Sequence, residues 1–150
     1  MITDKLTTLC SAVALNTGGA GNYVLGDSID IGTLRDIGQG SEMFLVVTVE
    51  TTLTSGGSAT LQIALTSDAV NPNNASTSTV HATSAVLAVA AGPAGTNLMT
   101  VQIPWEGAAY ERYLGIRQIT AGAAFTGGKI NAFLTPTPSS KRVYDEYAGL

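Results

Sequence analysis

Residues 58–66 read SATLQIALT, and this stretch decides the fold class. Apolar side chains occupy every second position, and most positions between them are polar. Successive side chains of a β-strand point to opposite faces of a sheet, so this period of two predicts a strand with one face in a core and the other in solvent. The apolar set is Ala59, Leu61, Ile63 and Leu65, and the polar set is Thr60, Gln62 and Thr66.

The same alternation recurs along the chain and predicts about eight strands, separated by turn sequences rich in Gly, Asn and Pro. No stretch of useful length repeats every 3.6 residues, so we expect little helix. The expected strands are 22–25, 28–32, 42–50, 58–66, 84–89, 98–103, 112–119 and 129–134.

Two connections between these strands are closed by glycine pairs. They lie between Glu50 and Ser58 and between Ile119 and Lys129, and we expect both to be β-hairpins. Residues 67–83 hold Asn, Ser, Thr and Pro with few apolar residues, which predicts a projecting surface loop.

A length of 150 residues fits one domain. Eight strands that are each apolar on one face can bury those faces between two packed antiparallel sheets. The strand count favours a jelly roll over an immunoglobulin-like order. We divide the chain into an N-terminal arm (1–21), a jelly-roll β-sandwich (22–135) and a C-terminal tail (136–150). The tail begins where it does because Pro136 and Pro138 cannot continue a central strand.

The chain is poor in charge, with 12% charged and 45% hydrophobic residues. An ordinary soluble domain has roughly 25% charged residues, so much of this surface must be Thr, Ser, Asn, Ala and Gly. Such a surface is easily desolvated, so it suits burial against neighbouring proteins in an assembly. We expect self-association as a homodimer, with a trimer as the alternative.

Charge and cysteine content exclude several classes of protein. Eleven acidic against seven basic residues offer no positive field for nucleic acid. The apolar run at 84–91 is too short to cross a membrane, and the N-terminal residues do not predict a signal peptide. The single cysteine, Cys10, excludes an intrachain disulfide and fits synthesis in a reducing cytoplasm.

The sequence offers little for catalysis. His81 is the single histidine, which excludes sites that need two imidazoles. A Ser-His-Asp triad or a Cys10–His81 pair could still form in the folded chain, but no sequence motif accompanies either. Residues 18–21 lack the Lys of a phosphate loop, and the acids at 27, 30 and 36 lack calcium-loop spacing. We therefore expect no enzymatic activity, catalytic residue, cofactor or metal.

Three segments carry a family resemblance. They are PWEGAAYERYLGIRQ (104–118), IDIGTLRDIGQGSEMFLVVTVE with TTLTSGGSATLQIALTSD (29–68), and YDEYAGL (144–150). In these segments the chain resembles the cement, or capsid-stabilising, proteins of tailed bacteriophages, the Bbp16-like family. The resemblance implies a jelly roll that sits as a homo-oligomer on the outer surface of the virion capsid. There it would bind the major capsid protein and stabilise the shell by bridging its subunits.

Candidate partner-binding residues lie in the first of these segments and in the tail. Arg112, Tyr113 and Arg117 are expected to face away from the core residues around them and toward a partner. The alternative is that Arg112 or Arg117 pairs with an acid of the same domain, such as Asp36.

In the tail, Lys141 and Arg142 would meet acids on the shell, and Tyr144 and Tyr147 would act as amphipathic anchors. The alternative is a tail that folds back over its own sandwich.

A carbohydrate-binding or fibre-associated β-sandwich module is the alternative function. Such a site needs aromatic platforms beside acids, and the chain has one Trp, Trp105, which we expect to pack at a strand end.

Overall fold

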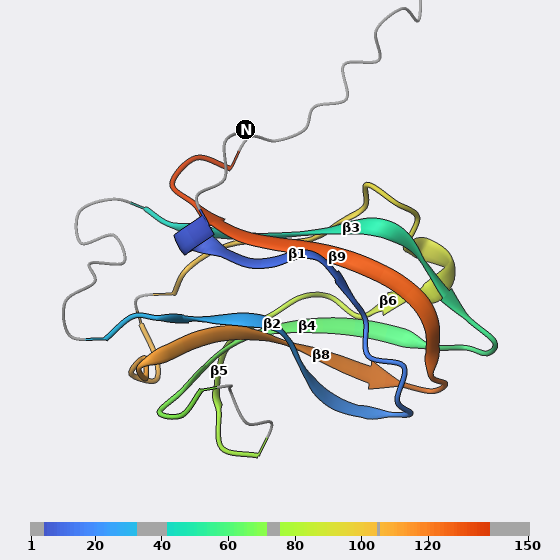
Figure 1. The fold of residues 1–150 in the computed structure, drawn as a ribbon, viewed down its shortest axis with the longest axis horizontal. Coiled ribbons are helices and arrows are strands. Elements are labelled where there is room, and N and C mark those ends of the chain that lie inside the picture. The colour runs from blue at the N-terminus through green and yellow to red at the C-terminus, as the bar shows by residue number, and fades with distance from the viewer. Residues whose placement is uncertain (1–4, 33–41, 72–75, 105, 139–150) are drawn as a thin grey trace, which may run out of the picture.

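The computed structural model describes residues 5–32, 42–71, 76–104 and 106–138, and its strands form two antiparallel sheets packed face to face (Figure 1). One sheet has the order β1 (Thr8–Ala14), β9 (Phe125–Thr135), β3 (Phe44–Ser55) and β7 (Asn97–Gln102). The other has the order β2 (Gly21–Asp30), β8 (Tyr113–Ala121), β4 (Thr60–Asp68) and β5 (Thr79–Thr83), with β6 (Leu87–Ala88) also paired to β4.

The strand pairs are nested within one another along the chain. β1 pairs with β9, β2 with β8, β3 with β7 and β4 with β5, all antiparallel. The all-β sandwich of two antiparallel sheets predicted from the sequence is confirmed. The described helices are two three-residue 3-10 turns, η1 (Lys5–Thr7) and η2 (Val89–Ala91).

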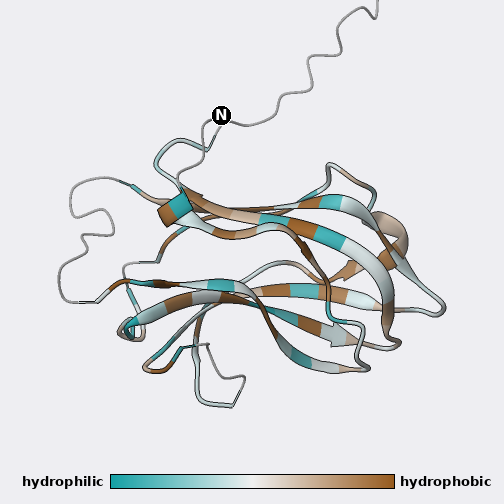
Figure 2. Ribbon diagram, in the orientation of Figure 1, coloured by the Kyte–Doolittle hydropathy of each residue, from teal (hydrophilic) through white to brown (hydrophobic). Residues whose placement is uncertain are grey.

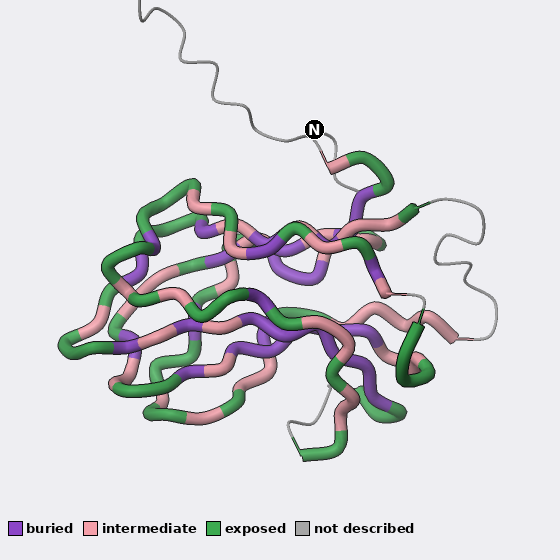
Figure 3. The backbone as a smooth tube through the Cα atoms, turned by 180° about the vertical axis from the view of Figure 1, so that it is seen from behind, coloured by how far each residue is buried: buried purple, intermediate pink, exposed green. Residues whose placement is uncertain are grey.

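The core lies between the sheets, where the predicted alternation places it. Leu61, Ile63 and Leu65 of β4 are at most 1% exposed. Figure 2 shows apolar and polar residues alternating along the strands, and Figure 3 shows buried residues recurring along the same strands. Full burial of such a side chain contributes about 1.5–3 kcal/mol, so these positions dominate the stability of the sandwich.

Both predicted hairpins are wrong. β3 and β4 lie in different sheets, and so do β8 and β9, so each glycine-rich connection is an arch that crosses from one sheet to the other. The arches lie side by side: Ser55 pairs with Phe125, and Thr60 pairs with Ala121. A glycine pair predicts a tight reversal of the chain, but it does not say which sheet the next strand joins.

The predicted N-terminal arm is also corrected. Residues 8–14 form edge strand β1, whose Leu9 and Cys10 are buried in the core. Register shifts between Thr8 and Cys10 and between Cys10 and Val13 break the alternation that would have identified it. The strands expected at 22–25 and 28–32 are one strand, β2, with a register shift between Leu25 and Ile29.

The expected loop at 67–83 contains two strand segments. Its first two residues end β4, and Thr79–Thr83 forms edge strand β5, which has too few apolar residues to show an alternation. The strand expected at 84–89 is reduced to the two residues of β6, followed by η2.

The sandwich has two different ends (Figure 1). At the first, which we call the turn end, the strands are joined by the short connections 15–20, 56–59 and 122–124. At the second, which we call the loop end, lie the strand ends that the longer connections 31–43, 69–78 and 103–112 join; there the Ile31 N–H donates to the Arg112 carbonyl, and the Ile103 N–H donates to the Met43 carbonyl. β1 begins and β9 ends at the loop end, because Thr8 pairs with Phe133 and Phe44 pairs with Thr135.

Candidate interaction surface

An exposed ion pair marks the loop end of the sandwich. Asp30, the last residue of β2, is paired in register with Tyr113, the first residue of β8. The guanidinium of Arg112 binds the Asp30 carboxylate with two nitrogens: Nη2 lies 2.9 Å from Oδ2 and Nε lies 3.1 Å from Oδ1. The Arg112 side chain is 59% exposed, and that of Asp30 is 43% exposed. This bidentate ion pair is therefore accessible from solvent.

Tyr113 and Gly32 complete this cluster. The Arg112 Cζ atom lies 5.0 Å from the centroid of the Tyr113 ring, within the range of a cation–π contact. The Gly32 N–H donates to Asp30 Oδ1 at 2.9 Å. Hydrogen bonding to Asp30 raises the pKa of Arg112, which stays charged. The predicted acid partner, Asp36, lies outside the described residues, and Asp30 takes its place.

A second cluster fixes connection 103–112 to the sheet below it. The Glu111 N–H donates to the Ser67 Oγ at 3.0 Å, and Ser67 Oγ lies 2.7 Å from His81 Nε2. The His81 ring stacks on Tyr110, with ring centroids 3.8 Å apart, and the Tyr110 hydroxyl donates to the Pro104 carbonyl at 2.9 Å. These contacts hold both halves of the connection against β4 and β5.

The Ser67–His81 pair has the distance of a nucleophile and its base, but Ser67 is fully buried and already accepts the Glu111 N–H. Attack on a substrate requires an exposed hydroxyl, so the arrangement serves to position the connection. Burial lowers the pKa of His81, and the negative charge of Glu111 partly opposes this shift.

Arg117 is largely buried in the structure. It lies on the outer face of its sheet, as expected, but it is only 4% exposed. Desolvation lowers its pKa, and the nearby Asp68 carboxylate opposes that shift. Asp68 in turn accepts the Val70 N–H and the Thr77 hydroxyl from connection 69–78, the connection that follows β4. Arg117 is therefore much less accessible than Arg112, whose side chain is exposed.

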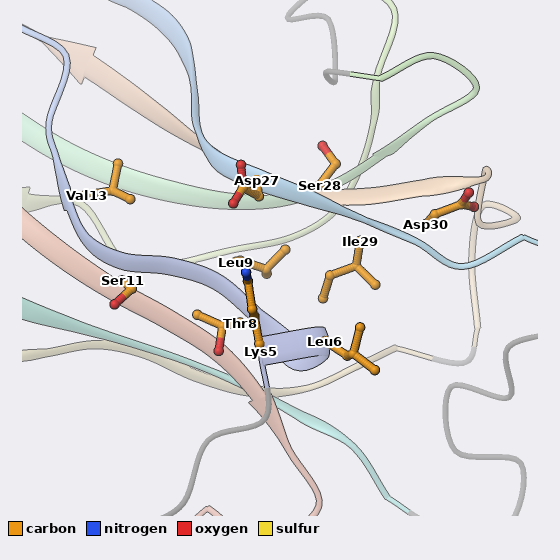
Figure 4. A pocket seen from close by; sticks show the side chains of 10 residues that line it. All are labelled: Lys5, Leu6, Thr8, Leu9, Ser11, Val13, Asp27, Ser28, Ile29 and Asp30. Carbon is orange, nitrogen blue, oxygen red and sulfur yellow. The ribbon is translucent and has the colours of Figure 1, made fainter.

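A groove opens between the edge strands β1 and β2 (Figure 4). Its volume is about 380 Å³. Figure 4 shows Ile29 reaching from β2 toward Leu6 of η1, with Asp30 near the loop end. Its lining residues are Lys5, Leu6, Thr8, Leu9, Ser11, Val13, Asp27, Ser28, Ile29 and Asp30.

The candidate residues of the tail, Lys141, Arg142, Tyr144 and Tyr147, lie outside the described part of the chain. β9, which precedes the tail, ends at the loop end, the same end that carries Arg112 and Tyr113. Sequence reasoning missed Asp30, Ser67 and Tyr110 as partners in these clusters. These residues are far from their partners in the sequence, and only the register of the paired strands brings them into contact.

The comparison with known families decides the classification. The Bbp16 family model matches residues 17–134. The chain belongs to the Bbp16 family. The match places it in a phage-associated family and covers the sandwich from β2 to β9. No curated protein matches this Bbp16-family chain.

Over the described ranges of this Bbp16-family chain, no helix has the length and apolar character needed to cross a membrane. In the same ranges, His, Cys, Asp and Glu side chains do not gather in groups of three that would suit a metal ion.

Proposed function

We propose that the protein is a cement protein: a structural virion component that binds the outside of a bacteriophage capsid and stabilises it by bridging major capsid protein subunits. The observation that carries the proposal is the loop end. The described ends of connections 31–43 and 103–112 are hydrogen-bonded to each other there, and β9, the strand before the tail, finishes at the same end. The exposed Arg112–Asp30 pair offers a charged contact on this surface.

The chain's composition supports a protein that is partly buried in an assembly. A surface poor in charge loses little solvation on contact, and a second bound copy makes each weak contact effectively intramolecular. Binding only to the assembled shell shifts the equilibrium away from disassembly. We propose a homodimer, with a trimer as the alternative; light scattering at micromolar concentration distinguishes both from a monomer.

The alternative sugar-binding module would need free aromatic faces beside acids. At the loop end, Tyr110 stacks on His81, and Tyr113 lies beneath the Arg112 guanidinium. These contacts favour a role for both rings in shaping a protein-binding surface.

The test is co-sedimentation with purified capsids of the phage that encodes the chain, stripped of the native protein. Arg112→Ala should weaken shell binding roughly tenfold or more, because it removes a central charged contact. Lys129→Ala is the matched control: Lys129 is also an exposed base, but it lies on β9 opposite Ala14, where β1 ends toward the turn end. If Arg112→Ala binds shells normally while Lys129→Ala does not, the loop end is not the contact.

Removal of residues 142–150 gives a second test. The truncated chain should remain folded, since all described core residues precede it, but it should bind shells poorly and protect them less against heat. Normal decoration and protection by the truncated chain would restrict the contact to the sandwich itself.

A further inference from the structure

The outer edge of β7 carries backbone groups that its sheet leaves open. The Ile103 N–H donates to the Met43 carbonyl at 2.8 Å, and this pair continues the register in which Val101 lies opposite β3. In an antiparallel ladder every second residue bonds to a given neighbouring strand, so Ile103 and Val101 bond to β3. The N–H and C=O groups of Thr100 and Gln102 therefore point the other way. Because β7 is the last strand of its sheet within the described ranges, these groups face outward.

The other sheet edges are bulged or short. β1 has two register shifts and a positive φ at Ala12. β2 has a shift between Leu25 and Ile29, where exposed Asp27 lies, and β5 has a shift in its pairing with β4. β6 is two residues long. Bulges, charged side chains and short strands all keep sheet edges from pairing with other chains.

β7 lacks these features over most of its length. Its register shift falls at Leu98, so residues 99–102 stay in register with β3. The stretch from Asn97 to Ile103 contains neither a charged residue nor a proline. The open row ends at Pro104, which has no N–H to donate. An uncharged, regular edge of this kind can accept a strand from another chain.

A second copy of β7 can pair with this edge. If two copies pair antiparallel around a two-fold axis that passes between their Val101 residues, Thr100 of each copy lies opposite Gln102 of the other. Both pairs would then exchange their N–H···O=C bonds, because all the groups involved point outward. The Thr100 and Gln102 side chains are exposed and uncharged, so they meet without repulsion.

The nearby acids lie outside the paired residues. Glu42 and Glu50 lie before and within β3, one strand further from the axis, and Glu50 accepts a hydrogen bond from Asn131 of β9 on the side away from β7. Glu106 follows the end of β7 in connection 103–112. The edge of β2 differs, because self-pairing there would bring together copies of acidic residues such as Asp27.

We propose that β7 is the interface of the homodimer: it pairs with β7 of a second copy and joins the two β1-β9-β3-β7 sheets into one. The inference rests on the proposed homodimer and names its contact surface. The antiparallel pairing turns the two loop ends in opposite directions. One dimer would therefore present two separated loop ends, which suits the bridging of two capsid subunits.

The first test changes the charge at the same two exposed positions in two ways. Thr100→Lys/Gln102→Lys would place like charges opposite each other in both pairs, whereas Thr100→Lys/Gln102→Glu would place a base opposite an acid in both. At low salt, sedimentation equilibrium of the full chain should give a dimer Kd about tenfold weaker than that of the parent for the first variant. The second variant should dimerise as tightly as the parent or more tightly. Both should keep the parent's circular dichroism spectrum, because the changed side chains are exposed in a single copy.

Amide hydrogen exchange gives a second test in the unmodified protein. The amides of Thr100 and Gln102 should exchange rapidly in dilute solution and about tenfold more slowly once most of the protein is dimeric. The amide of Val101, which bonds to β3, should stay protected at every concentration.

Two outcomes would overturn the proposal. Equal dimer Kd values for the two charge variants, with exchange at Thr100 and Gln102 independent of concentration, would assign the dimer to another surface and leave the homodimer standing. A chain that stays monomeric up to about 1 mM would overturn both the homodimer and this interface. Neither outcome decides the capsid contact, which Arg112→Ala tests on shells.

Discussion

The two ends of the sandwich are held together by different means. At the turn end, the backbone itself approaches closely at Gly122, where an added Cβ would lie 2.3 Å from the Ser58 carbonyl oxygen. At the loop end, side chains bridge connections that are far apart in the sequence, as in the Arg112–Asp30 and Ser67–Glu111 contacts. We expect close backbone packing at the turn end to contribute more to stability than the side-chain contacts that shape the loop end.

The largest expected loss of stability comes from a substitution at the turn end. Gly122 has a φ of +76°, so Gly122→Ala combines a left-handed backbone with the clash at Ser58. We expect a loss of about 3–4 kcal/mol in the free energy of unfolding, measured by urea denaturation.

Gly107 at the loop end is the matched control. It also has a positive φ, +111°, but nothing lies within 4 Å of the position of its Cβ. Gly107→Ala should therefore cost only the backbone strain, about 1–3 kcal/mol. Equal losses for the two variants would show that close packing does not distinguish the ends.

The next effect concerns the polar group buried at the turn end. Gln118 is fully buried, and its amide accepts the Asn16 N–H at 2.8 Å and donates to the Asn16 carbonyl at 3.0 Å. Gln118→Ala leaves both groups without this partner and opens a cavity, so we expect a loss of about 2–3 kcal/mol. Exposed Gln102 provides the control, and thermal unfolding of Gln102→Ala should match the parent protein.

A smaller effect is expected at the loop end. Ser67→Ala removes the acceptor of the Glu111 N–H and the hydrogen-bond partner of His81, at a cost of about 1–2 kcal/mol in urea denaturation. Amide exchange in residues 106–112 should accelerate more than exchange at residues 16–18. A uniform acceleration across the protein would mean that the contact stabilises the whole fold and not this connection.

The contrast between the ends also explains what the sequence could predict. Alternation identified the core of β4, and Leu61, Ile63 and Leu65 are all buried, because a strand's period of two is a local property. It failed for β1, where bulges and a positive φ at Ala12 interrupt the pattern. It also failed for the arches, since the choice of sheet depends on packing across the whole domain.

The candidate surface was predicted only in part. Arg112 and Tyr113 were assigned to an exposed surface, and Arg112 is exposed there, but its partner Asp30 lies 82 positions away. Arg117 was placed on the correct face, yet connection 69–78 supplies partners to Asp68 beside it. No periodic pattern reveals which loop covers which face of a sheet.

The smallest expected effect is a dependence on pH confined to the loop end. Desolvation lowers the pKa of His81 from its ordinary value of 6.5, so the folded state prefers the neutral ring and the unfolded state binds the proton more readily. The stabilisation is complete above about pH 6.5 and is lost as the pH falls through the lowered folded pKa. The protein should therefore lose a little stability between pH 7.5 and 5, and His81→Gln should lose less. Because the chain has one histidine, its imidazole NMR signals report this titration directly. A midpoint above 6.5 would reverse the sign and show that the attraction of Glu111 outweighs burial.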